Sequence, residues 1–212
     1  MPLLTHAGKR ILFIHIPKTG GSSVERVMAH CGPLTFKNDD PNLPYPVSLQ
    51  HLHGGPLVEQ IAPGSVDWSF LIVRHPVARL ISEYRFQKRK PRLLRDSLSF
   101  GGWLHYSFLR QRLNPWYRDN HFRMQTDFLY PDCEIFRFED SVDDVVVRFA
   151  KRMNQPTPAA RIHEKKSSRT DVELTQQHLD RIAAHYKADL DYFGYGMDKA
   201  SLKKAGVELP RL

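Results

Sequence analysis

The sequence predicts an α/β fold with three layers, in which helices cover both faces of a central parallel sheet. Short apolar, β-branched runs typical of buried strands alternate with longer segments of helical periodicity, and this alternation favours a parallel sheet. The chain has 212 residues, of which 41% are hydrophobic and 25% charged. This length suits one substantial core and is cramped for two, so we expect a single domain over residues 1–212.

The N-terminal part predicts a strand, a turn and a helix in that order. Arg10–His15 is an apolar, β-branched run that ends shortly before a proline, as a buried strand does. Segment 18–23 contains two glycines and predicts a turn, and Val24–Cys31 has helical spacing up to a Gly-Pro pair. The Asn-, Asp- and Pro-rich segment 35–46 predicts a loop.

The middle of the chain predicts two more strands and a helix. Val47–His53 is predicted as a short second strand that leads into a Gly-Gly-Pro turn. Trp68–Val73 is a second clear buried run. A helix is predicted over Val77–Lys90, because apolar side chains recur there at helical spacing and Pro91 ends the pattern.

The C-terminal half continues the alternation of helices and strands. Ser99–Tyr130 predicts two helices around Asn114-Pro115, and Cys133–Phe138 predicts a third clear strand. Ser141 is the expected N-cap of a helix that ends at Met153, since Asp residues in its first turn favour the helix dipole. The last predicted helix is the amphipathic segment Thr175–Leu190.

Composition excludes several classes of protein. No apolar run approaches the roughly 20 residues that span a bilayer, and the N-terminus lacks the basic and apolar regions of a secretory signal. The two cysteines, Cys31 and Cys133, suggest neither a disulfide framework nor a metal site. We therefore expect a soluble, cytoplasmic protein.

The loop after the first predicted strand has the composition of an anion-binding site. Such a loop exposes backbone N–H groups at the positive end of a helix dipole, and Gly20 and Gly21 let an anion approach them. Lys18 adds a cation, and hydroxyl donors come from Thr19, Ser22 and Ser23. The lysine precedes the glycines, so this is not a Walker A loop. The alternative is an ordinary strand-to-helix turn with a solvent-exposed lysine.

A second anion site is predicted after the strand that ends at Val73. Arg74 comes at its carboxyl end, where open parallel sheets bind ligands, and Ser82 lies two turns into the following helix. Alternatively, the arginine forms a surface ion pair and the serine is solvated. Together with the first loop, the pair predicts a ligand phosphorylated at two places rather than a nucleoside triphosphate.

The two loops resemble the cofactor loops of the Golgi-type carbohydrate sulfotransferases, the family that contains heparan sulfate 2-O-sulfotransferase. The matching segments are His15-Ile-Pro-Lys-Thr-Gly-Gly-Ser-Ser23 and Arg74-x-Pro76-x-x-Arg79-x-x-Ser82, and the ending Tyr186-x-x-Asp189-x-x-x-Phe193-Gly194-Tyr195 is similar as well. Ser22 stands where the family commonly has threonine, and His75 where it usually has aspartate. Since the family's membrane anchor is missing, we expect a soluble bacterial relative with a P-loop NTPase-like sulfotransferase fold.

The resemblance implies sulfuryl transfer from 3′-phosphoadenosine 5′-phosphosulfate (PAPS) to a hydroxyl, with PAP as the product and no metal. The first loop then holds the 5′-phosphosulfate, with Lys18 at the bridging oxygen, while Arg74 and Ser82 hold the 3′-phosphate. A polar loop before the last helix closes over the nucleotide in related enzymes, and Ser168 and Arg169 are the candidates there. The implied cofactor-binding residues are Pro17, Lys18, Thr19, Gly20, Gly21, Ser22, Ser23, Arg74, Ser82, Ser168 and Arg169.

A histidine is the best general base near neutral pH. The resembling family carries a His-x-His element between its cofactor loops, which maps the base onto His53 and leaves His51 for structure or acceptor contact. A merely structural His53 is the alternative. His15, inside the first predicted strand, is expected to be buried and hydrogen-bonded.

The acceptor is predicted from a basic, aromatic window. Residues Tyr84–Arg123 contain ten basic and two acidic residues, which accounts for the whole net charge of +8. Helices over residues 84–130 interleave aromatic and cationic side chains, which suit an anionic carbohydrate and also stacked bases. We expect a carbohydrate or another hydroxyl-bearing acceptor and no nucleic acid. The rival functions are a P-loop-type kinase and a basic nucleic-acid-binding module, and a solvated arginine-rich face is the structural alternative.

Overall fold

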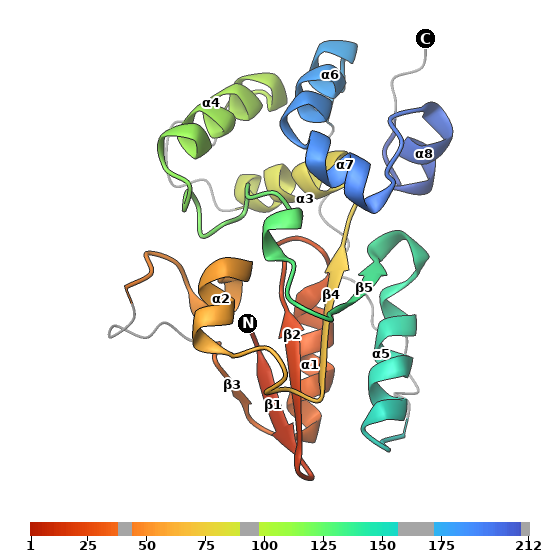
Figure 1. The fold of residues 1–212 in the computed structure, drawn as a ribbon. Coiled ribbons are helices and arrows are strands. Elements are labelled where there is room, and N and C mark those ends of the chain that lie inside the picture. The colour runs from red at the N-terminus through yellow and green to blue at the C-terminus, as the bar shows by residue number, and fades with distance from the viewer. Residues whose placement is uncertain (38–43, 90–97, 157–171, 209–212) are drawn as a thin grey trace. The chain divides into compact units, whose positions relative to one another are not determined.

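The computed structural model describes residues 1–37, 44–89, 98–156 and 172–208 (Figure 1). The chain forms two compact units: unit 1 contains Met1–Val73 and Asp127–Glu164, and unit 2 contains Arg74–Thr126 and Lys165–Leu212. The prediction of a single domain stays a prediction. Within the described ranges, no helix combines the length and the apolar character that crossing a membrane requires.

Unit 1 is built on a five-stranded sheet with the strand order β3-β1-β2-β4-β5. The parallel part that the sequence predicts is present, because β2 pairs parallel with β4 and β4 pairs parallel with β5. The strands are β1 (Leu3–His6), β2 (Lys9–Ile14), β3 (Leu34–Thr35), β4 (Trp68–Val73) and β5 (Glu134–Arg137).

The expectation of an entirely parallel sheet is wrong at β1, which runs antiparallel to both of its neighbours. Ala7 and Gly8 form a two-residue hairpin between β1 and β2, and their φ values are 48° and 75°. Positive φ at both central residues defines the turn that matches the twist of a hairpin, so the chain folds back at once. The sheet is therefore mixed.

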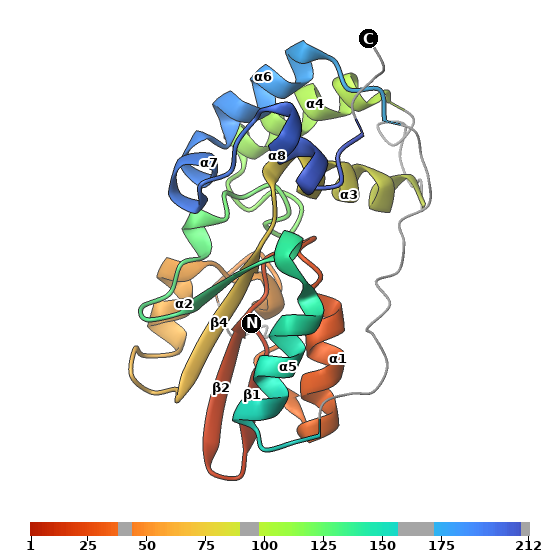
Figure 2. The ribbon, with the colours of Figure 1, turned by 90° about the vertical axis from the view of Figure 1, so that its right-hand side faces the viewer.

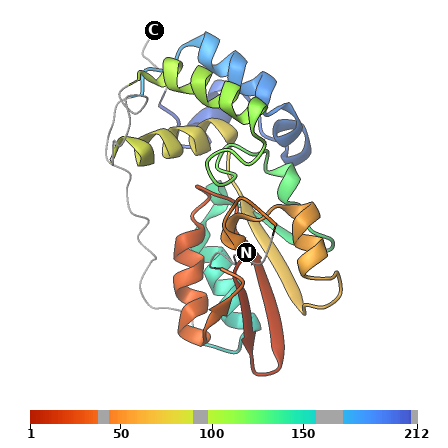
Figure 3. The same cartoon turned by 90° about the vertical axis from the view of Figure 1, so that its left-hand side faces the viewer.

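Helices lie against both faces of the sheet of unit 1. Helices α1 (Gly21–Cys31) and α5 (Val142–Arg152) cover one face, and η1 (Leu49–His51) and α2 (Gly54–Gln60) lie on the other (Figures 2 and 3). The core under α1 and α5 is contributed by alternate strand residues and by one face of each helix: Ile11, Phe13, Phe70, Ile72, Val24, Met28, Val145 and Phe149. The α/β class is confirmed.

The strand predicted at Val47–His53 is wrong. The segment forms the short 3-10 helix η1, in which the His51 amide donates to the Ser48 carbonyl at 3.0 Å. Leu49 and Leu52, three positions apart, are both buried. This is the spacing of a 3-10 turn and not the alternation of a strand.

The described residues of unit 2 form helices and turns around a core of aromatic and branched side chains. Tyr84, Trp103, Phe122 and Tyr186 are among its buried members. The helices are α3 (Pro76–Lys88), α4 (Phe100–Leu113), α6 (Gln176–His185), α7 (Lys187–Phe193) and α8 (Lys199–Lys204).

Two helix predictions in unit 2 need correction. The single helix expected over Thr175–Leu190 ends at His185, and α7 starts after Tyr186, whose backbone leaves the helical region with φ −105° and ψ 29°. The second helix expected before Tyr130 is replaced by turns, because residues 118–120 all have positive φ between 56° and 62°. Three left-handed residues in succession cannot continue a right-handed helix.

Candidate functional site

The first predicted cofactor loop lies in unit 1 and joins β2 to α1. Its turn is closed by Thr19, whose buried hydroxyl donates to the Ile16 carbonyl at 2.9 Å. Lys18 has a φ of 69°, in the left-handed region that lysine adopts only where the surroundings impose it. The side chain of Lys18 is partly exposed, while Pro17 and Thr19 beside it are buried. The loop therefore holds its lysine in a constrained backbone position.

The two glycines of the loop are each required by geometry. Gly20 is the N-cap of α1 with a φ of 85°, and a Cβ on it would meet Val142 Cγ2 at 3.1 Å. A Cβ on Gly21 would lie 2.3 Å from the ring of His15. Because the cap residue has no side chain, it cannot satisfy the first amides of α1, those of Gly21 and Ser22. Such amides at the positive end of a helix attract anions.

The ring of His15 packs against Gly21 of this loop. The expectation that His15 is buried and hydrogen-bonded is confirmed. The residue is 5% exposed, and its Nδ1 contacts the carboxylate of Glu25 on α1. Gln50 donates to the same carboxylate, and Lys37 forms an ion pair with it at 2.8 Å. Burial raises the pKa of Glu25, but His15, Lys37 and Gln50 together outweigh burial and lower it to about 2. Glu25 is therefore an anion that fixes the His15 ring.

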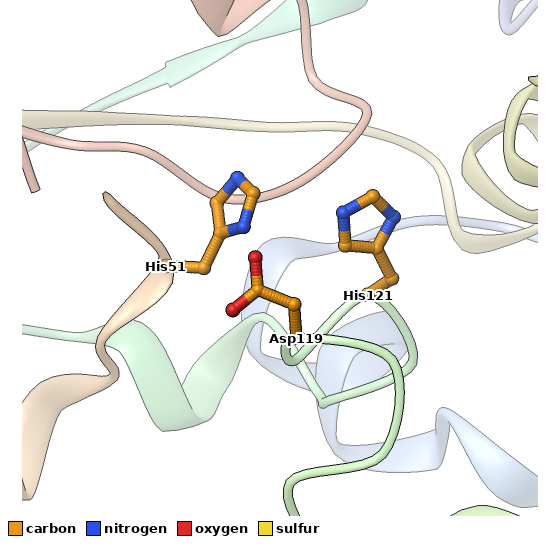
Figure 4. Close-up of side chains that lie close together, drawn as sticks. All are labelled: His51, Asp119 and His121. Atoms are coloured by element: carbon orange, nitrogen blue, oxygen red, sulfur yellow. The ribbon is translucent and has the colours of Figure 1, made fainter. Parts of the chain in front are cut away.

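The two histidines of the predicted His-x-His element occupy different surroundings in unit 1. His51 ends η1 (Figure 4). Its ring contacts that of His15 edge-on, with 5.2 Å between the ring centroids. His53 is the N-cap of α2 and is partly exposed. The next residue, Gly54, packs so closely that a Cβ on it would lie 2.4 Å from the Leu129 carbonyl. This contact fixes the start of α2 and hence the backbone of His53.

The second predicted cofactor loop belongs to unit 2. Arg74 follows β4 directly, and Ser82 lies partly exposed on α3. His75 is the N-cap of α3: its Nδ1 accepts from the Val77 amide at 3.2 Å, and its Nε2 donates to the Gly196 carbonyl at 2.9 Å. An aspartate at this position caps a helix equally well but cannot donate, so the histidine adds a bond to the C-terminal segment.

A left-handed turn over residues 118–120 presents the side chains of Asp119 and His121 from one loop of unit 2 (Figure 4). The Arg79 guanidinium, which is 2% exposed, donates to the His121 carbonyl at 3.0 Å and to the Arg123 carbonyl at 2.8 Å. His121 Nδ1 lies 2.7 Å from the buried carboxylate of Glu83. Side chains of α3 thus hold a strained turn, and Arg79 of the second loop motif has a structural role.

The predicted aromatic window divides into core and surface. Trp103 and Tyr117 are buried in the core of unit 2. Trp116 is partly exposed, and the guanidinium carbon of Arg123 lies 5.3 Å from its ring centroid. This cation–π pair keeps an aromatic face and a cation together at the surface of unit 2.

Five predicted residues cannot be placed. Ser168 and Arg169, the candidates for the polar loop over the nucleotide, lie outside the described residues. The same holds for Lys90, Arg92 and Arg95 of the basic window.

Comparison with protein families identifies the class. The model of the sulfotransferase family matches residues 2–196, which include both predicted cofactor loops, so the chain belongs to this family. Comparisons with curated proteins and with solved structures found no match. The predicted class of enzyme, a transferase of sulfuryl groups, is confirmed at the level of the family.

Proposed function

We propose that this sulfotransferase transfers the sulfuryl group of PAPS to a hydroxyl of a carbohydrate acceptor. The observation that carries the proposal is the constrained loop of unit 1, which combines Lys18, an uncapped helix N-terminus and two obligatory glycines in a chain of the sulfotransferase family. The proposal includes a P-loop-type three-layer fold, membership of the carbohydrate sulfotransferase branch and chemistry without a metal.

The loop fits the 5′-phosphosulfate of PAPS. The first amides of α1, those of Gly21 and Ser22, lie at the positive end of the helix and suit an anion with several oxygens. The Thr19 hydroxyl donates to the Ile16 carbonyl within the loop. We therefore assign the backbone amide of Thr19, and not its hydroxyl, to contact with the phosphosulfate. Lys18 carries the charge that the bridging oxygen needs when the sulfuryl group leaves.

The residues of the second loop complete the assignment. Arg74 and Ser82 bind the 3′-phosphate, for which a guanidinium and a hydroxyl are suitable donors. Ser168 and Arg169 remain the proposed contacts of the polar loop.

His53 is the proposed general base. The acceptor oxygen forms a bond to sulfur, the bond from sulfur to the bridging phosphate oxygen breaks, and the acceptor proton passes to the imidazole of His53. PAP leaves with the electron pair of the broken bond. The step needs no oxidant or reductant.

The partly exposed Trp116 and its neighbour Arg123 support a carbohydrate acceptor. A sugar ring packs its C–H face on an aromatic ring, and a guanidinium pairs with the carboxylate or sulfate of an acidic glycan. An acidic glycan is accordingly the acceptor to try first.

Nucleotide binding tests the donor. At a concentration of about 100 times Kd, a ligand stabilises the fold by about 2.7 kcal/mol, which corresponds to a rise in Tm of roughly 5–10 °C at this chain length. We expect this rise with PAP and a much smaller one with AMP, ADP or ATP. Radiolabelled sulfuryl transfer from PAPS to acidic glycans then tests the reaction. Stabilisation by ATP with magnesium but not by PAP would favour the kinase instead.

Replacement of His53 by alanine tests the base. A positioned general base contributes roughly 100-fold or more, so kcat is expected to fall by that factor while the Kd for PAP stays nearly constant. Single-turnover kinetics and calorimetry measure the two quantities. The parallel variant His51→Ala is expected to retain more activity than His53→Ala, and the reverse order would assign the base to His51.

A further inference from the structure

Asp189 is a buried carboxylate at the centre of a hydrogen-bond network within unit 2. The residue is 0% exposed and lies on α7. Its Oδ2 accepts from the Gln125 amide at 2.9 Å and from Gln125 Nε2 at 3.3 Å. Its Oδ1 accepts from the Thr126 amide at 3.0 Å and from the Thr126 hydroxyl at 3.2 Å. A buried charge is tolerated where it is satisfied in this way, and four donors meet that need.

The side chain of Gln125 links Asp189 to the backbone of Arg74. Gln125 Oε1 accepts from the Arg74 amide at 2.9 Å, and Gln125 Nε2 donates to the Arg74 carbonyl at 2.9 Å. The orientation of the side-chain amide is fixed, because Nε2 must also donate to Asp189. The amide thus pairs with the backbone of Arg74 as the peptide group of a neighbouring strand would.

We propose that Gln125 and Asp189 are positioning residues that hold Arg74 for the 3′-phosphate of the sulfuryl donor. The inference rests on the proposed function, in which Arg74 binds that phosphate. Both backbone polar groups of Arg74 are bonded by one side chain, and that side chain is held by a buried carboxylate 64 residues further along the chain. Asp189 acts on the nucleotide only through this chain of bonds.

Recognition of a phosphate by arginine depends on direction, because the guanidinium presents its donors in a planar fork. The fork is aimed correctly only when the Cα from which the side chain starts is fixed. If the backbone of Arg74 is no longer held, the positive charge remains but the guanidinium donors lose their fixed direction. We therefore expect a loss of preference for the 3′-phosphate rather than a loss of fold.

The test is the variant Asp189→Asn in the full chain. In asparagine an NH₂ group replaces one of the two acceptor oxygens of Asp189. This donor then faces an N–H group of Gln125 or Thr126, and one hydrogen bond is lost. Loss of one hydrogen bond to a charged group lowers affinity by about tenfold, so we expect the Kd for PAP to rise by that factor. The Kd for AMP, which lacks the 3′-phosphate, stays constant. In turnover, the KM for PAPS rises by about tenfold while kcat at saturation changes by less than about twofold.

A matched control separates positioning from general stability. Tyr186 is 1% exposed, and its hydroxyl donates to the Phe122 carbonyl at 2.8 Å. Burial raises the pKa of Tyr186 well above its usual value, so this hydroxyl stays a donor. Tyr186→Phe removes a buried hydrogen bond one turn before Asp189 without touching Gln125. It is expected to lower Tm and to keep the preference for PAP over AMP.

Two further variants decide the outcome. Gln125→Met removes the bonds to Arg74 but leaves Asp189 its bonds to two backbone amides, so it provides the same readout if Asp189→Asn fails to fold. In an Arg74→Ala background, Asp189→Asn is expected to have no further effect on the Kd for PAP.

The proposed donor and the proposed positioning role would be contradicted by different results. An unaltered protein that binds PAP no better than AMP contradicts the proposed donor and the positioning together. An unaltered protein that prefers PAP, with the preference intact in Asp189→Asn or Gln125→Met, overturns the positioning alone. An effect of Asp189→Asn that persists without the Arg74 side chain also overturns it.

Discussion

Replacement of Lys18 by alanine is expected to lower kcat by roughly 100- to 1000-fold, the usual cost of removing one group that stabilises developing negative charge. Negative charge grows on the bridging oxygen as the sulfuryl group leaves, so the lysine contributes more in the transition state than in the bound ground state. The Kd for PAP is therefore expected to change much less than kcat. Initial-rate kinetics with PAPS and calorimetry with PAP measure both.

Two control variants separate charge from backbone effects at Lys18. Lys151 is exposed on α5, and Lys151→Ala removes the same net charge without an expected effect on kcat. Glycine adopts a positive φ without the steric cost that a side chain brings, so Lys18→Gly removes the free-energy cost of the φ of 69° at this position. It should be as inactive as Lys18→Ala if the ammonium group is what matters. Activity regained in Lys18→Gly would instead assign the defect of Lys18→Ala to the backbone.

Local patterns were sufficient for the elements that bury one continuous apolar run or one apolar helix face. Strand β4 is buried at every position, and the run Trp68–Val73 has the same bounds in sequence and structure. Helix α5 starts after Ser141, whose hydroxyl accepts from the Asp143 amide as the cap prediction requires. In these cases short-range spacing and the tertiary environment favour the same conformation.

The predictions failed where tertiary contacts decide the conformation. The three left-handed residues 118–120 form a turn that is held by Arg79 and Glu83 of α3, which are more than 30 residues away in sequence. The candidate site divides in the same way. The glycines and Lys18 form a local motif, whereas Gln125 and Asp189 contact each other across 64 residues of sequence. In the sequence, Asp189 is distinguished only as part of the C-terminal segment that resembles the family. No sequence pattern marks Gln125 as a functional residue.

A methyl group at Gly21 is expected to be among the most damaging changes in unit 1. The new Cβ would lie 2.3 Å from Cδ2 and 2.4 Å from Nε2 of His15, so one of the two groups must move. The His15 ring is buried and is held by the Glu25 carboxylate, to which Gln50 also donates, so the ring moves only at a cost in free energy. Overpacking of this kind costs about 3 kcal/mol. Gly21→Ala is therefore expected to lower the free energy of unfolding by that amount in urea denaturation.

The same displacement should weaken nucleotide binding, because Gly21 supplies one of the first amides of α1. Gly55→Ala is the matched control: Gly55 is exposed on α2 with no heavy atom within 4 Å of a new Cβ. Its stability is expected to stay within about 1 kcal/mol of the unaltered protein and to shift upward, since alanine is the better helix former. A normal Kd for PAP in Gly21→Ala would mean that the N-terminus of α1 does not contact the donor. Normal stability would mean that the His15 ring is not fixed by Glu25.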